Sequence, residues 1–124
     1  MENIQVKNRL IGVGQPAYVI AEMSANHAGS IERAKEIIYA AKESGADCIK
    51  IQTYTPDTLT INCHNKYFHI KNGTWEGENL YSLYGKAYTP WEWQAELKWE
   101  ADKIGIDFLS SISINCTSFF AVNK

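Results

Sequence analysis

The stretch YVIAEMSANHAGS, Tyr18 to Ser30, passes from a run of apolar residues directly into a cluster of polar ones. The run YVIAEM has the length and composition of a buried strand. After Ser30 the apolar residues recur at helical spacing, with charged residues between them. Ser30 can cap this helix, and Gly45 suits the left-handed position that follows a helix end. The run CIKIQT, residues 48–53, gives a second strand, so the sequence predicts a strand–helix–strand unit.

A weak internal repeat extends this pattern. The stretch AKESGADCIK (41–50) resembles ADKIGIDFLS (101–110), since both contain a helix end, a glycine, an aspartate and a strand. The second helix begins in the stretch TPWEWQAEL, where Thr89 is the predicted cap. The segment before residue 18 alternates polar and apolar residues and contains Gly12, Gly14 and Pro16, which is typical of a hairpin. This order of elements predicts an α/β fold with parallel strands.

Polar residues follow each predicted strand at its carboxyl end. Right-handed crossovers bring the carboxyl ends of parallel strands to one edge of the sheet. We therefore expect a shared crevice that contains the polar residues at these ends. These residues are Glu22, Asn26, His27, Lys50, Gln52, Thr53, Ser110 and Ser111.

The residue types leave several roles open. Glu22 can act as a general acid or base, or it can anchor its loop through backbone amides. Lys50 lies mid-strand, where an ammonium group binds an anion, extends toward water, or forms an imine as in lysine-dependent aldolases. Asn26 and His27 can bind a ligand or brace the turn into the helix. Strand alternation places Lys50 and Gln52 on one side of their strand.

Composition excludes several classes of protein. The 124 residues are 45% hydrophobic and 21% charged with a formal charge of −2, which fits a globular protein without a basic surface for nucleic acid. The three cysteines form neither a disulfide framework nor a zinc knuckle, and Cys48 is expected to be buried. No signal peptide or membrane-spanning run is found, so we expect a cytoplasmic protein that acts on small molecules. Residues 56–88 form an aromatic-rich insertion, and its histidines, His64 and His69, are expected on the surface.

Three strings together suggest a family. With IAEMSANHAGS, GADCIKIQTYTPDTLT and AYTPWEW in the same order, the chain resembles the sialic acid synthase family. The stretch IKNGTWEGENLYSLYGKAYTPWEWQAEL is similar to its pseudaminic acid synthase branch. The resemblance implies the amino-terminal part of a (β/α)₈ TIM barrel. We expect about three parallel strands and two helices, preceded by a short β-hairpin.

The resemblance also implies an activity and a set of site residues. Such enzymes condense phosphoenolpyruvate with an amino sugar, here a 2,4-diacetamido-trideoxy-hexose, and release phosphate. Glu22 would be catalytic by moving a proton or orienting water, and Lys50 would bind the phosphoenolpyruvate anion. Gln52 would hold the sugar and Ser111 the phosphate, while Asn26 and His27 would complete the substrate-binding set. The alternatives are an N-acetylneuraminate or legionaminic acid synthase fragment, or a non-catalytic binding fragment.

The resemblance further implies a divalent metal, manganese or magnesium, whose histidine ligands lie in a portion absent from this chain. Full-length relatives are expected to be homodimers. Residues 1–111 correspond to the synthase barrel, whereas residues 112–124, ISINCTSFFAVNK, resemble no continuation of it. We therefore expect a truncated chain that lacks activity alone.

Overall fold

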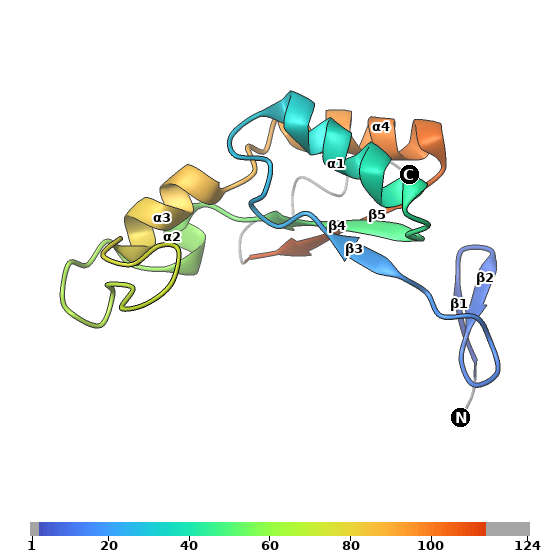
Figure 1. Ribbon diagram of the computed structural model, residues 1–124, viewed down its shortest axis with the longest axis horizontal. Coiled ribbons are helices and arrows are strands. Elements are labelled where there is room, and N and C mark those ends of the chain that lie inside the picture. Colours follow the sequence, from blue (N-terminus) through green and yellow to red (C-terminus); the bar gives the residue numbers. More distant parts are fainter. Residues whose placement is uncertain (1–2, 114–124) are drawn as a thin grey trace.

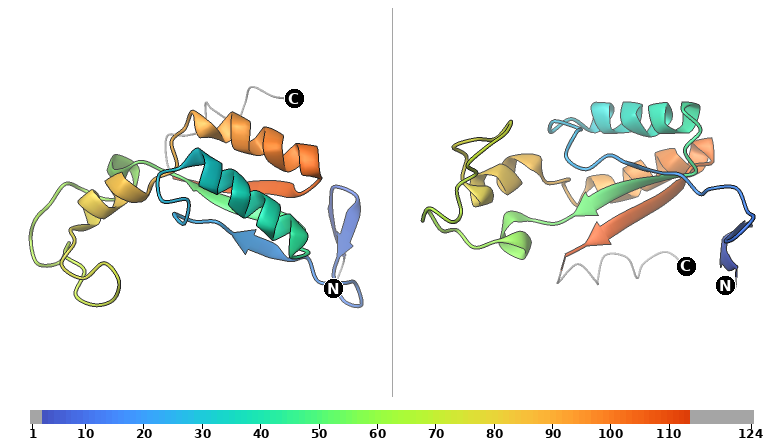
Figure 2. Two further views of the ribbon diagram at one scale, coloured as in Figure 1. Left: turned by 45° about the horizontal axis from the view of Figure 1, so that its top comes forward. Right: turned by 60° about the horizontal axis from the view of Figure 1, so that its bottom comes forward.

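The computed structural model describes residues 3–113, which form a three-stranded parallel sheet with two long helices on one face (Figure 1). The strands are β3 (Ile20–Glu22), β4 (Cys48–Thr53) and β5 (Asp107–Ile112), in that order across the sheet. The helices are α1 (Ile31–Glu43) and α4 (Trp93–Ile104), which lie side by side over the sheet (Figure 2). The predicted βαβαβ arrangement is confirmed.

The hydrophobic core lies between the sheet and these two helices. Ile49 and Ile51 of β4 are fully buried there. Their helical contacts in the core include Ala34 and Ile38 of α1 and Leu97 of α4. Alternation along β4 therefore places Lys50 and Gln52 on the opposite face of the sheet, as predicted. We call this face, which neither α1 nor α4 covers, the inner face, because it would line the inside of the complete barrel.

The ends of α1 agree with the sequence, whereas the start of α4 differs. The Arg33 amide donates to Ser30 Oγ (3.2 Å), and Gly45 has φ 85°, a left-handed conformation that glycine adopts without strain. Thr89 was predicted to cap α4, but this prediction is wrong because the helix begins later, at Trp93. The Trp93 amide donates to the Pro90 carbonyl in a preceding turn, and the Thr89 hydroxyl contacts buried His27 instead.

The predicted hairpin is present before the first sheet strand. It consists of β1 (Ile4–Val6) and β2 (Arg9–Ile11), which pair antiparallel. The hairpin lies at the amino ends of the sheet strands, on the opposite side of the sheet from the insertion that follows β4 (Figure 1). It thus lies far from the predicted crevice.

The aromatic insertion contains two short helices that the sequence did not predict. They are α2 (Pro56–Leu59) and α3 (Leu80–Ala87). The Thr55 amide donates to Thr58 Oγ1 (2.9 Å) at the start of α2. The Tyr81 amide donates to Asn79 Oδ1 (3.0 Å) at the start of α3. These local caps allow short helices to form beside the carboxyl ends of the sheet.

The predicted boundary after residue 111 falls inside β5, which includes Ile112. Residues 114–124 lie outside the described part, so the proposed tail at 112–124 stays a prediction. Among the described helices, none is long and apolar enough to cross a membrane.

Candidate active site at the carboxyl ends of the strands

Glu22 and Lys50 meet on the inner face of the sheet. They are register partners in the parallel pairing of β3 with β4. Lys50 Nζ lies 3.2 Å from Glu22 Oε1 and 3.3 Å from Oε2, so the ammonium group donates to both carboxylate oxygens. The predicted convergence of these two side chains is confirmed, and their catalytic and binding roles stay predictions.

Gln52 and Ser111 extend this polar cluster toward the end of the sheet. They are register partners between β4 and β5, which places them on the same face as Lys50. Gln52 Nε2 is 3.5 Å from Glu22 Oε1, at the outer limit of a hydrogen bond. A cavity of about 140 Å³ opens beside this pair. Its lining residues are Gln52, Tyr54, Leu59, Ser111, Ile112 and Ser113.

Ser110 occupies the other face of β5. Its Oγ lies 2.5 Å from Thr53 Oγ1, in a hydrogen bond that either hydroxyl can donate. Thr53 itself is 2% exposed, so this contact belongs to the helix-covered side. The prediction that Ser110 and Thr53 lie in the shared crevice is therefore wrong, and Ser111 is the serine that faces the cluster.

The Glu22–Lys50 pair is accessible to solvent and to ligands. The Lys50 side chain is 29% exposed and the Glu22 side chain is 43% exposed. An ammonium group carries three donors, so Lys50 can bind an incoming anion while it still contacts Glu22. Imine formation needs a neutral amine, whereas this geometry holds Lys50 in an ion pair. The arrangement therefore favours an electrostatic role for Lys50 over an aldolase role.

His27 is fully buried and braces the turn between β3 and α1. The Gly29 amide donates to His27 Nδ1 (3.1 Å), which leaves the ring proton on Nε2 for donation to Thr89 Oγ1 (3.2 Å). The Trp93 ring packs edge-on against the imidazole, with ring centroids 5.4 Å apart. Burial lowers the pKa of His27, which favours the neutral imidazole. Both ring nitrogens are thus used internally, and the structure favours bracing over ligand binding.

Asn26 also stabilises this turn. Its Nδ2 donates to the Met23 carbonyl (2.9 Å), and its own carbonyl accepts from Arg33 Nε (3.0 Å). Ser24 and Ala28 adopt positive φ values of 51° and 49°, so the turn requires uncommon backbone conformations. The polar residues after β3 therefore shape the loop that supports Glu22. Direct substrate contact by Asn26 stays a prediction.

Sequence reasoning missed the residues that hold His27. Thr89 and Trp93 lie more than sixty positions further along the chain, and no local spacing links them to the first turn. The only signal in the sequence is the TPWEW string, which by itself predicts a helix start.

The described residues do not form a metal site by themselves. Residues 3–113 contain no group of three or more histidine, cysteine, aspartate or glutamate side chains that could hold a metal ion. His64 and His69 are exposed on the insertion, as predicted, and His69 Nε2 lies 3.1 Å from the His64 carbonyl. The expected manganese or magnesium remains a prediction.

Comparison with known proteins places this geometry in a family. The family model described as NeuB family matches residues 37–118. The chain belongs to the NeuB family. It is 53% identical over 94 residues to the pseudaminic acid synthase of Campylobacter jejuni, covering 76% of this chain and 27% of that relative. It is 50% identical over 97 residues to the pseudaminic acid synthase of Helicobacter pylori, covering 78% of this chain and 28% of that relative.

A solved structure supports the fold. The N-acetylneuraminic acid (sialic acid) synthetase of Leptospira borgpetersenii matches with a TM-score of 0.75 and 24% identity. The match covers 95% of this chain and 37% of that protein. The expected resemblance and the partial (β/α)₈ barrel are therefore confirmed. The NeuB chain spans little more than a quarter of the length of the curated relatives named above.

Proposed function

We propose that this NeuB chain is part of a nonulosonic acid synthase of the pseudaminic acid branch. The whole enzyme condenses phosphoenolpyruvate with a 2,4-diacetamido-trideoxy-hexose and releases phosphate. The observation that carries the proposal is the Glu22–Lys50 pair at the carboxyl ends of β3 and β4, with Gln52 and Ser111 beside it. The identity of 50–53% to two pseudaminic acid synthases supports the choice of branch.

The proposed chemistry uses the charges of this cluster. The methylene carbon of phosphoenolpyruvate bonds to the aldehyde carbon of the open-chain sugar, whose oxygen gains a proton. Water adds to the resulting cationic carbon and gives one proton to Glu22, which replaces the proton that the sugar oxygen has taken up. The C–O bond to phosphate then breaks, the new hydroxyl group becomes the keto group, and phosphate leaves with the proton of that hydroxyl group. Lys50 and Ser111 hold the anionic donor, and Gln52 orients the sugar. A fixed ammonium group and hydroxyl donors suit a dianionic substrate because they stabilise its charge without reorganisation.

The proposal for the whole enzyme includes manganese or magnesium, which would polarise the sugar aldehyde. The described residues lack a site for it, so its ligands would come from elsewhere in the enzyme. We expect the 124-residue chain alone to release no phosphate from the two substrates. We also expect the whole enzyme to be a homodimer.

A chimera tests the roles of the two charged residues. The matched region of the Campylobacter jejuni synthase is replaced by the corresponding residues of this chain. Phosphate release is then measured for Lys50→Met and Glu22→Gln. Loss of a positioned acid–base group lowers the rate by about 10²–10⁴-fold, so we expect a loss in this range for Glu22→Gln. For Lys50→Met we expect a raised KM for phosphoenolpyruvate.

Lys98→Met is the matched control, because Lys98 is a half-exposed lysine on α4 that pairs with Asp102. Activity near that of the control in both site variants would contradict the assigned roles. A chimera that prefers N-acetylmannosamine to the diacetamido sugar would instead support the N-acetylneuraminate alternative. Phosphate release by the unextended chain would overturn its expected inactivity.

A further inference from the structure

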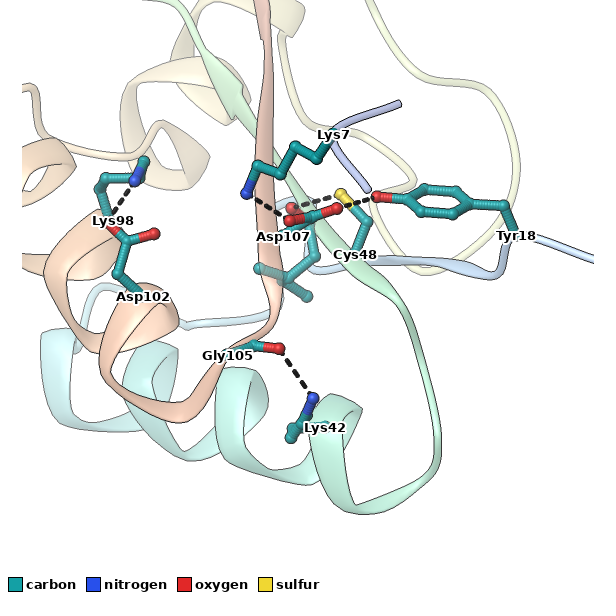
Figure 3. A network of polar contacts seen from close by, with 9 residues as sticks. Lys7, Tyr18, Lys42, Cys48, Lys98, Asp102, Gly105 and Asp107 are labelled. Carbon is teal, nitrogen blue, oxygen red and sulfur yellow. Dashed lines mark hydrogen bonds and ion pairs between the residues drawn. The ribbon is translucent and has the colours of Figure 1, made fainter. Parts of the chain in front are cut away.

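The two aspartates of the internal repeat contact the amino-terminal segment in the same way. Asp107, at the start of β5, uses one carboxylate oxygen for an ion pair with Lys7 (Figure 3). Its other oxygen accepts a hydrogen bond from the Tyr18 hydroxyl (2.6 Å). The hydrogen bond from Lys7 and, to a smaller extent, the hydrogen bond from Tyr18 lower the pKa of Asp107. The carboxylate thus joins the hairpin to the segment that leads into β3.

Asp47 holds the equivalent position before β4. One of its oxygens pairs with Arg9 of the hairpin, and the other accepts from the Val19 amide (2.8 Å). Arg9 also donates to the Ala17 carbonyl (3.2 Å). The backbone joins the two repeats at this point, because the Asp107 amide donates to the Asp47 carbonyl (3.0 Å). Each repeat therefore supplies one carboxylate, which binds one basic side chain of the hairpin and one group of the segment between the hairpin and β3.

The amino-terminal segment has little apolar attachment to the sheet. Ile4, Leu10 and Val13 are 66%, 48% and 76% exposed. The Lys7 and Arg9 side chains are themselves 64% and 39% exposed. Charged and polar contacts therefore carry much of the attachment, and solvent-exposed ion pairs of this kind are weak and sensitive to salt.

This segment covers one thiol on the inner face, which none of the described helices covers. Cys48 is 3% exposed, although its register partner Ile20 is 47% exposed. The Cys48 sulfur lies beside the Tyr18 hydroxyl and the Asp107 carboxylate (Figure 3). Cover of the thiol by Tyr18 and the Lys7–Asp107 pair explains why it is buried while its neighbour is not.

We propose that residues 3–18 form a detachable amino-end plug, latched by Lys7–Asp107 and Arg9–Asp47. When both pairs and the Tyr18–Asp107 hydrogen bond open, the amino-end plug leaves the sheet and uncovers Cys48. The plug closes the amino end of the inner face, opposite the candidate active site, without unfolding the core between the sheet and its helices.

The rate of Cys48 alkylation by iodoacetamide, resolved by peptide mass spectrometry, tests this device in the full chain. The double variant Lys7→Ala/Arg9→Ala removes both latches at residues that lie outside the hydrophobic core, so the core stays intact. Ion pairs that are at least partly exposed stabilise weakly, and loss of both should speed Cys48 alkylation by roughly 2- to 30-fold. Lys98→Ala is the control, since it removes an exposed ion pair with Asp102 that lies on α4 (Figure 3).

A salt series on the unchanged chain gives a second measurement. Raising the salt from about 0.05 M to about 0.5 M shortens the Debye length about threefold and should accelerate Cys48 alkylation. The double variant should lose most of this salt dependence. The proposal is overturned if the double variant reacts as slowly as Lys98→Ala. Hydrogen exchange at the buried amides of Ile49 and Ile51 reports opening of the core. The proposal is also overturned if Cys48 in every variant is alkylated only as fast as these amides exchange, because the thiol would then become accessible only when the core opens.

Discussion

Replacing Thr89 by valine tests whether His27 stabilises the turn between β3 and α1. The substitution keeps the shape of the side chain and removes the hydroxyl that accepts from His27 Nε2. Thr89 is 1% exposed and His27 is fully buried, so water cannot readily replace the lost acceptor. The imidazole N–H is then left unsatisfied in the core.

The expected loss follows from this burial. A buried donor left without its partner costs about 1–3 kcal/mol. For a domain of this size, this corresponds to a fall in Tm on the order of 5–15 °C. Loss of packing adds little, because valine and threonine are nearly isosteric.

Urea unfolding of the full chain, followed by tryptophan fluorescence, measures the effect, since Trp93 packs on the imidazole. The control is Thr74→Val, at an exposed threonine of the insertion, which should change stability by less than about 0.5 kcal/mol. A Thr89→Val chain as stable as this control would refute the bracing role of His27. In that case the imidazole would be free to turn toward a ligand.

Four further substitutions should show the expected signs. Ser30→Ala removes the cap of α1 and should lower the free energy of unfolding, measured in urea, by about 1 kcal/mol. Gly45→Ala should lower it by about 1–2 kcal/mol, because residue 45 has φ 85°. Burial lowers the pKa of His27, so just below about pH 6.5 this imidazole is protonated in the unfolded chain and still neutral in the folded chain. The free energy of unfolding should therefore fall as the pH drops below this value. Urea unfolding of His27→Gln at a series of pH values should lack this part of the pH dependence. The lowered pKa of Asp107 contributes stability above about pH 4 that is lost as pH falls through its folded value, and acid titration of Asp107→Asn should lack that loss.

Local periodicity predicted the two faces of β4 correctly. Ile49 and Ile51 alternate with Lys50 and Gln52, and alternation depends only on neighbours in sequence. The meeting of Glu22 with Lys50 was also predictable, because parallel strands with right-handed crossovers share one carboxyl edge.

Other features depend on contacts between distant segments and could not be predicted. The Thr89 hydroxyl had two plausible partners, and the choice of His27 over the helix amides is set by tertiary packing. The short helices α2 and α3 form only with caps such as Asn79, because helices of this length are unstable alone. The repeat was visible in sequence, but the cations that bind Asp47 and Asp107 come from a separate hairpin.

The register of the sheet couples the chemistry to the core. A slip of β4 by a single position would bring its ammonium group under the helices and would leave two isoleucines in water. Burial of Ile49 and Ile51 therefore penalises any alignment in which Lys50 fails to face Glu22. The residues that pack the core and the residues that carry the charge alternate along the same short strand. A change in the register of β4 would therefore disturb the packing and the position of the charge together.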